Sequence, residues 1–250
     1  MEQKAIIETS GLTKAYGTQL AVDQLSFSVH EGEIFGFLGP NGAGKTTTIL
    51  ILLGLTEPTK GTAAVCGFNP TREAINVKRL VGYLPEHVGF YEDMTAIENL
   101  RYVARLNRIP EKVASGKIEE VLKTVGLSED SDKDVGAYSR GMQQRLGIAE
   151  VLIKEPRLVI LDEPTLGLDP DASNRMIELI QQLSRDKGMT VLFASHQLHQ
   201  VQEISDRIGI MIRGKMVALG PIQQLAKEKL GVDKKKYTLE ELYMKYFQEG

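Results

Sequence analysis

Gly39-Pro40-Asn41-Gly42-Ala43-Gly44-Lys45-Thr46 is the stretch that decides the fold of this 250-residue chain. It follows Glu33–Leu38, a short apolar run that predicts a buried strand, and it precedes Ile49–Leu53, which predicts a buried helix. Glycines at this spacing let backbone N–H groups converge on a phosphate, and the start of the helix adds its dipole. We therefore expect residues Gly39 to Thr47 to bind the phosphates of a nucleotide, rather than to form a chance glycine-rich turn.

A second apolar run, Leu158–Leu161, predicts a buried strand that ends in two acids, Asp162 and Glu163. Strands often end in a carboxylate, but downstream of a phosphate loop this ending indicates a nucleotide hydrolase. Lys45 would supply charge to the β- and γ-phosphates, and the Thr46 hydroxyl would bind Mg²⁺. Asp162 would hold the same ion through its water shell, and Glu163 would polarise the attacking water. We expect a Mg²⁺-dependent ATPase, although Glu163 taken alone also fits an ordinary surface acid.

Composition and charge exclude several classes of protein. Hydrophobic residues make up 42% of the chain, which is enough for a substantial core, and the net charge is −3. The only basic cluster, Lys234–Lys236, is expected to be a solvated stretch, so no nucleic-acid partner is indicated. A single cysteine, Cys66, excludes an internal disulfide. No apolar run approaches the roughly 20 residues of a membrane span, and no export signal is visible, so we expect a cytosolic chain.

The predicted elements alternate between strands and helices, which indicates an α/β fold with a mostly parallel sheet. Residues 86–155 have a mainly helical pattern, with a capping box at Thr95 and Glu98 and with Pro110 in the first turn of a helix. We expect one domain, in which 1–85 and 156–220 form the nucleotide-binding core, 86–155 form a helical subdomain and 221–250 form a C-terminal helical tail.

Tyr138-Ser139-Arg140-Gly141-Met142 leads into a predicted helix, and it stands where one large family has the signature Leu-Ser-Gly-Gly-Gln. With the two motifs above, the chain resembles the nucleotide-binding subunit of an ATP-binding cassette (ABC) transporter over nearly its whole length. The resemblance implies a phosphate-loop core with an N-terminal antiparallel β part. It also implies that Ser139 and Gly141 meet the ATP held by a second subunit. Tyr138, Arg140 and Met142 depart from the pattern, and a simple helix cap at Ser139 is the plainer alternative.

Three more positions match the family. The resemblance implies that Tyr16 stacks on adenine, that Asp169 contacts the partner subunit beside ATP, and that His196 touches the γ-phosphate. His196 would thus join Glu163 and Lys45 in catalysis. Taken alone, each residue has an ordinary interpretation: a core tyrosine, a turn before a helix, or a histidine in a structural hydrogen bond.

Glu86 ends Val81-Gly82-Tyr83-Leu84-Pro85-Glu86, which resembles the family's lid loop, where the last residue is usually glutamine. The carboxylate can still bind Mg²⁺ or a water through oxygen, but it adds negative charge near the γ-phosphate. One hypothesis is that the site depends more strongly on Mg²⁺, or that Glu86 takes up a proton when ATP binds. The alternative is that glutamate replaces glutamine as an oxygen ligand without further consequence.

The resemblance implies an ATP-hydrolysing subunit that dimerises, most simply with its own copy, around two ATP molecules. Closure and hydrolysis would power a separate integral membrane permease, so the chain would lie peripherally on the inner face of the cell membrane. The signature and lid loop are most similar to the branch that serves drug, antibiotic and sodium exporters. The alternative is a soluble cassette ATPase that remodels a cytosolic complex, as in iron–sulfur assembly. A phosphate-transferring kinase would leave Ser139–Arg145 unexplained.

Overall fold

The computed structural model describes residues 4–230 and 238–249, so the Lys234–Lys236 run lies outside the described residues. The strands are β1 (Ala5–Tyr16), β2 (Gln19–His30), β3 (Ile34–Leu38), β4 (Lys60–Val65), β5 (Val81–Leu84), β6 (Leu158–Asp162), β7 (Thr190–Ser195), β8 (Arg207–Ile212) and β9 (Lys215–Gly220). The helices are α1 (Lys45–Leu52), α2 (Ala74–Leu80), α3 (Ala96–Leu106), α4 (Glu111–Thr124), α5 (Arg140–Leu152), α6 (Pro170–Arg185), α7 (Leu198–Ile204), α8 (Ile222–Leu230) and α9 (Leu239–Glu249).

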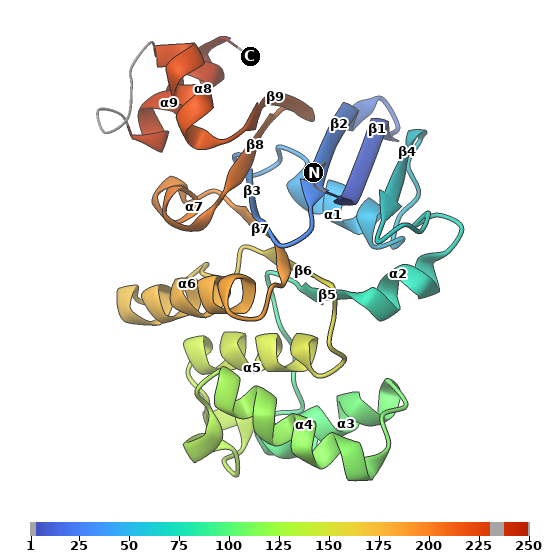
Figure 1. The fold of residues 1–250 in the computed structure, drawn as a ribbon, viewed down its shortest axis with the longest axis vertical. Coiled ribbons are helices and arrows are strands. Elements are labelled where there is room, and N and C mark those ends of the chain that lie inside the picture. The colour runs from blue at the N-terminus through green and yellow to red at the C-terminus, as the bar shows by residue number, and fades with distance from the viewer. Residues whose placement is uncertain (1–3, 231–237, 250) are drawn as a thin grey trace.

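The strands form two sheets, a six-stranded one and a three-stranded one (Figure 1). The larger sheet has the order β5-β6-β7-β3-β8-β9 and is parallel except for the β8–β9 hairpin. The smaller sheet has the order β2-β1-β4 and is antiparallel. The expected α/β fold, with a mostly parallel sheet and an antiparallel N-terminal part, is confirmed.

Strand β3 lies between two hydrophobic cores, because its side chains alternate between the two faces of the larger sheet. Ile34 and Leu38 belong to the core that includes α5, α6 and α7, while Phe35 and Phe37 belong to the core shared with α1 and the smaller sheet. The Phe27 ring of β2 stacks on Phe35 and Phe37 at centroid distances of 5.7 and 5.6 Å. The phosphate loop therefore leaves a strand that is fixed from both sides.

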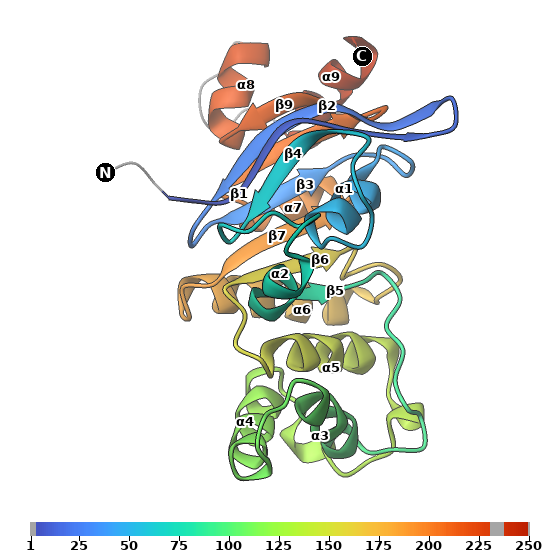
Figure 2. The ribbon, with the colours of Figure 1, turned by 90° about the vertical axis from the view of Figure 1, so that its right-hand side faces the viewer.

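Helices α3, α4 and α5 form a separate layer at one end of the molecule, with α5 nearest the sheet (Figure 2). The predicted capping box begins α3: Thr95 N donates to Glu98 Oε2 at 2.8 Å, and Glu98 N donates to Thr95 Oγ1 at 3.2 Å. Pro110 precedes α4 instead of lying in its first turn, because its ψ of 141° is extended. The proposed boundaries of the subdomains stay a prediction.

The last helix, α9, packs against α7 and α8 at the end of the molecule opposite the α3–α5 layer (Figure 1). Thr238 and Glu241 form a reciprocal cap, and Leu239 and Leu242 are buried. Leu239 N donates to Gln202 Oε1 of α7 at 2.8 Å. Among the described residues, none of the helices has both the length and the apolar character needed to cross a bilayer.

Gly54, which follows α1, is expected to tolerate no side chain. Its φ is +63°, and a Cβ there would lie 2.3 Å from the carbonyl oxygen of Pro70. Gly67 also has a positive φ, +84°, but has no atom within 4 Å of an added Cβ. Gly54→Ala should therefore lower the free energy of unfolding by about 3 kcal/mol, and Gly67→Ala by about 1 kcal/mol. Urea denaturation measures both, and equal losses would contradict this packing.

Candidate nucleotide site

Three strands of the larger sheet place the residues predicted to bind the nucleotide at one edge of that sheet. In the order β6-β7-β3, Asp162 is level with Ala194, and Ser195 is level with Leu38. Carboxyl ends of parallel strands meet at the same edge, where α/β proteins bind their ligands. The phosphate loop, Asp162–Glu163 and His196 are therefore neighbours in space, although more than 100 residues separate the loop from the other two groups in sequence.

The phosphate loop has the backbone that its glycines predict. Gly42 and Gly44 have φ of +78° and +105°, in the left-handed region that favours glycine. A Cβ at Gly44 would lie 2.2 Å from the carbonyl oxygen of Ala21, and one at Gly39 would lie 2.4 Å from that of Met211. These close approaches leave no room for side chains, so the loop can turn tightly into α1.

Glu163 links Lys45 and His196. Lys45 is 6% exposed, and its Nζ lies 3.3 Å from Glu163 Oε1 and donates to the Gly39 carbonyl at 2.7 Å. Nδ1 of His196 lies 2.8 Å from Glu163 Oε2, and the His196 backbone N–H also donates to that oxygen at 3.3 Å. The three residues assigned to catalysis are thus joined side chain to side chain, with Glu163 itself 5% exposed.

Asp162 and Thr46 form the second polar group of the site. Thr46 Oγ1 donates to Asp162 Oδ2 at 2.8 Å. Burial raises the pKa of Asp162 above its usual value, and the Thr46 hydrogen bond offsets this only in part. Asp162 Oδ1 is buried and has no hydrogen-bond partner among the described residues. A buried carboxylate oxygen without a partner fits a hard cation such as Mg²⁺, which prefers oxygen ligands.

A cavity of about 400 Å³ lies over the phosphate loop. Its lining comprises Tyr16, Gln19, Ala21, Pro40, Asn41, Gly42, Ala43, Gly44, Lys45, Thr46, Thr47, Glu86 and Glu163. Tyr16 is 53% exposed at the cavity, which excludes the core alternative for it. The Glu86 side chain is 40% exposed. Gln19 and Ala21 were not anticipated; the pairing of Gln19 with Tyr16 at the β1–β2 turn brings them there.

Ser139, Gly141 and Asp169 do not line this cavity. Ser139 Oγ accepts from Met142 N at 3.3 Å at the start of α5, and Asp169 Oδ1 accepts from Ala172 N at 2.8 Å at the start of α6. The two helix starts adjoin, since a Cβ on Gly141 would lie 2.9 Å from the Cβ of Ala172. Within one chain these residues form a second group, apart from the phosphate loop.

The three departures from the family signature each have a place in the structure. Tyr138 is buried, and its hydroxyl donates to the Asp130 carbonyl at 2.7 Å. Met142 packs partly buried against the core. The guanidinium of Arg140 lies over Gly167, where a Cβ would be 2.8 Å from Arg140 Cζ. Arg140 therefore covers the loop that leads to Asp169.

Comparison with known proteins agrees with this geometry. A family model described as "ABC transporter" matches residues 22–166. "Bacitracin transport ATP-binding protein BcrA" of Bacillus licheniformis is 45% identical over 222 residues, which cover 89% of this chain and 72% of the relative. "Linearmycin resistance ATP-binding protein LnrL" of Bacillus subtilis (strain 168) is 38% identical over 228 residues, which cover 91% and 73% of the two chains.

A solved structure titled "Structure of ATP binding subunit of ABC transporter" superimposes with a TM-score of 0.85. It is 29% identical, and the match covers 97% of this chain and 99% of that one. None of these relatives supports the alternative of a soluble remodelling ATPase. This chain belongs to the ABC transporter family, as one of its ATP-binding and ATP-hydrolysing subunits.

Proposed function

We propose that this chain hydrolyses ATP with Mg²⁺ through the residues gathered at the edge of the larger sheet. The contact of Glu163 with both Lys45 and His196 carries this proposal. Lys45 binds the β- and γ-phosphates, Glu163 orients and polarises the attacking water, and His196 approaches the γ-phosphate with its Nε2. Thr46, Asp162 and Glu86 would hold Mg²⁺, which neutralises charge on the phosphates when bound. Tyr16 offers its exposed ring to the adenine.

We infer that the working form is a dimer, in the simplest case of two identical chains. The support is the separation within one chain between the phosphate loop and the group formed by Ser139, Gly141 and Asp169. In a head-to-tail pair, that group would face the nucleotide held by the other copy. ATP that binds better between closed subunits shifts the population toward closure, and hydrolysis reverses the shift.

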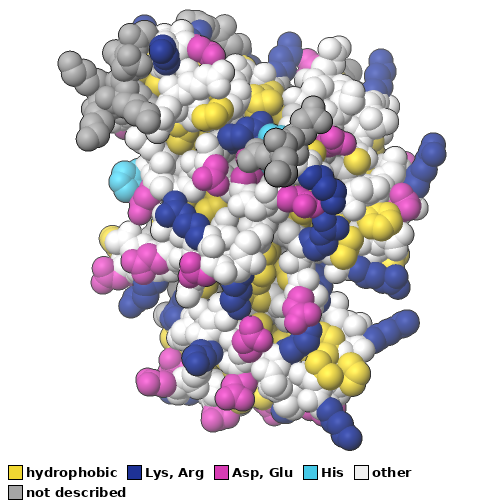
Figure 3. Space-filling view, in the orientation of Figure 1, with side chains coloured by type: hydrophobic (Ala, Val, Ile, Leu, Met, Phe, Trp, Pro, Cys, Tyr) yellow, Lys and Arg dark blue, Asp and Glu magenta, His cyan; other side chains and the backbone are white. Residues whose placement is uncertain are grey.

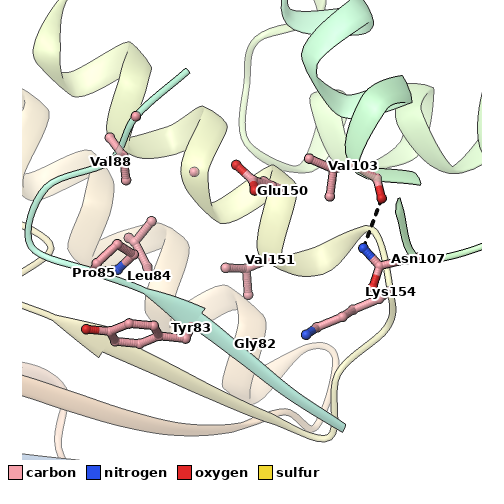
Figure 4. Close-up of a pocket in the computed structure, with 12 residues that line it drawn as sticks. Gly82, Tyr83, Leu84, Pro85, Val88, Val103, Asn107, Glu150, Val151 and Lys154 are labelled. Carbon is pink, nitrogen blue, oxygen red and sulfur yellow. Dashed lines mark hydrogen bonds between the residues drawn. The ribbon is translucent and has the colours of Figure 1, made fainter. Parts of the chain in front are cut away.

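A groove beside the nucleotide site is the proposed docking place for a membrane permease. It encloses about 230 Å³ between β5, α5 and the end of α3, and its lining includes residues on both sides of Glu86 in the sequence (Figure 4). Its lining comprises Gly82, Tyr83, Leu84, Pro85, Val88, Gly89, Val103, Asn107, Gly147, Glu150, Val151 and Lys154. Exposed Tyr91, Tyr102 and Leu106 of the same region add apolar surface. A partner bound here would contact Gly82–Pro85, the segment that ends at Glu86 in the nucleotide cavity.

Glu150 indicates what chemistry the permease presents. Figure 4 places its carboxylate among Val88, Val103 and Val151. Within the described part of the chain it makes no hydrogen bond or ion pair, and Lys154 Nζ instead donates to the Lys78 carbonyl at 2.6 Å. An acid in such surroundings is stabilised by an approaching cation. The permease segment is therefore apolar with a basic side chain opposite Glu150.

The transported molecule belongs to the permease, so the relatives provide the only indication of its class. BcrA is named for bacitracin transport and LnrL for linearmycin resistance. We infer export of an antibiotic-like molecule, with this chain bound to its permease at the inner face of the membrane. On the face in Figure 3, Lys and Arg side chains are interspersed with Asp and Glu side chains.

Glu163→Gln should bind ATP but hydrolyse it at least about 100-fold more slowly, because the amide cannot accept the water's proton. The variant should also accumulate as an ATP-bound dimer, since the step that reopens the pair is blocked. Steady-state phosphate release and light scattering with ATP and Mg²⁺ measure the two effects. Glu203→Gln, at an exposed position of α7, is the matched control and should behave as the parent. Unimpaired hydrolysis by Glu163→Gln would remove Glu163 from the mechanism.

Glu86→Gln tests whether the carboxylate makes nucleotide binding depend on Mg²⁺. Without the cation, Glu86 repels the triphosphate, so the variant should bind ATP more tightly than the parent when Mg²⁺ is chelated. With Mg²⁺ present the two affinities should be closer. Titration calorimetry with and without Mg²⁺ gives both ratios. If Mg²⁺ removal lowers the ATP affinity of both proteins by the same factor, Glu86 acts merely as an oxygen ligand.

Glu150→Gln should stabilise the isolated chain at pH 7. Burial raises the pKa of Glu150 above its ordinary 4.5, and the Lys154 charge opposes this only in part. The neutral form therefore favours folding below pH 4.5, and that contribution is lost as the pH rises through the folded-state pKa. Urea denaturation should show a gain for Glu150→Gln at pH 7 that disappears near pH 4. Glu119→Gln, at an exposed position, should show no such pH dependence. If Glu150→Gln raised the free energy of unfolding equally at both pH values, burial of the charged carboxylate would not be the cause.

A further inference from the structure

Gln200 joins three segments of the nucleotide site through its side-chain amide. Its Oε1 accepts from Thr165 Oγ1 at 2.6 Å, and its Nε2 donates to Ser173 Oγ at 2.7 Å. Gln200 lies in the first turn of α7, and Ser173 lies in the first turn of α6. Thr165 is 2% exposed and follows Glu163 by two residues. A single amide thus connects α7 with both ends of the loop between Glu163 and α6.

The other hydrogen bonds of this loop come from its own backbone and from the start of α6. Near its start, Leu166 N donates to the Glu163 carbonyl at 3.1 Å, and Leu168 N donates to the Thr165 carbonyl at 3.2 Å. At its end, Asp169 caps α6, and Ser173 N donates to the Asp169 carbonyl at 2.9 Å. These bonds lie within the loop and the first turn of α6. The two bonds made by Gln200 additionally connect Thr165 and Ser173 to α7.

The same amide relates this loop to His196. Helix α7 begins two residues after His196, whose Nδ1 contacts Glu163 at 2.8 Å. These connections form a closed ring. Glu163 is joined to Thr165 through the backbone, Thr165 to Gln200 by a hydrogen bond, Gln200 to His196 through the first turn of α7, and His196 to Glu163 by their side-chain contact. A ring of short connections restricts the positions that Glu163 and His196 can take relative to each other.

We propose that Gln200 is a positioning residue for hydrolysis, which holds Glu163, His196 and the loop that ends at Asp169 in one arrangement. The inference rests on the proposed roles of these three residues. Gln200 does not line the nucleotide cavity, so it acts on the chemical step and not on ATP binding. Displacements of about 1 Å in a catalytic group can lower a rate by a factor on the order of 100.

Gln200→Leu removes both hydrogen bonds while keeping most of the side-chain volume. We expect kcat for ATP hydrolysis to fall at least tenfold, while KM for ATP stays within twofold of the parent value. Gln200→Glu should restore most of the rate, because a carboxylate can accept hydrogen bonds from both hydroxyls. His199→Ala, at the exposed neighbouring position of the same helix, is the control and should leave kcat unchanged.

Thr165 provides a second pair of variants that keeps the proposal testable if Gln200→Leu does not fold. Thr165→Val should lose kcat, Thr165→Ser should retain it, and Thr165→Val combined with Gln200→Leu should be no slower than the slower single variant. The proposal is overturned if Gln200→Leu keeps its kcat within twofold. It is also overturned if Gln200→Glu is as slow as Gln200→Leu. Glu163→Gln in the same assay separates these outcomes, since only unimpaired hydrolysis there would contradict the proposed function itself.

Discussion

Parallel pairing of β3 with β7, and of β7 with β6, is the constraint on which the nucleotide site depends. The pairing sets Leu38 level with Ser195 and Asp162 level with Ala194, so the residues that follow these strands meet at one edge. Hydrophobic cores on both faces of the sheet hold this register, because a slip by one residue would turn every side chain to the wrong face. The glycines of the phosphate loop then fit against the backbone of Ala21 and Met211.

Much of this arrangement is predictable from sequence because its motifs are local. A strand, a glycine-rich loop and a helix follow one another in the chain, and the capping box of Thr95 and Glu98 spans four residues. The contacts that join distant segments are different. No periodicity in the sequence relates Gln200 to Thr165, or Gln19 to the cavity. Tyr138 differs from the family residue, and its hydrogen bond to the Asp130 carbonyl becomes evident only once the chain is folded.

The nucleotide site and the groove beside it each contain a polar group that is not fully matched within the described part of one chain. The nucleotide site contains Asp162 Oδ1, a buried oxygen without a described partner. The groove between β5, α5 and the end of α3 contains Glu150, whose pKa is raised by burial. Unmatched polar groups are costly for an isolated fold, and functional sites are where such costs are retained. We propose that a cation bound with ATP matches the first group and that the permease matches the second.

We propose that the phosphate loop of one chain meets the Ser139–Gly141 group of another when ATP is bound. Cross-linking between cysteines tests it most directly, because Cys66 is the only cysteine and can be replaced by serine. One Cys66→Ser chain would carry Asn41→Cys and a second would carry Arg140→Cys, at two exposed positions. We expect a disulfide-linked pair of the two chains when ATP is present under conditions that block hydrolysis. A mixture that cross-links equally without ATP, or not at all, would contradict it.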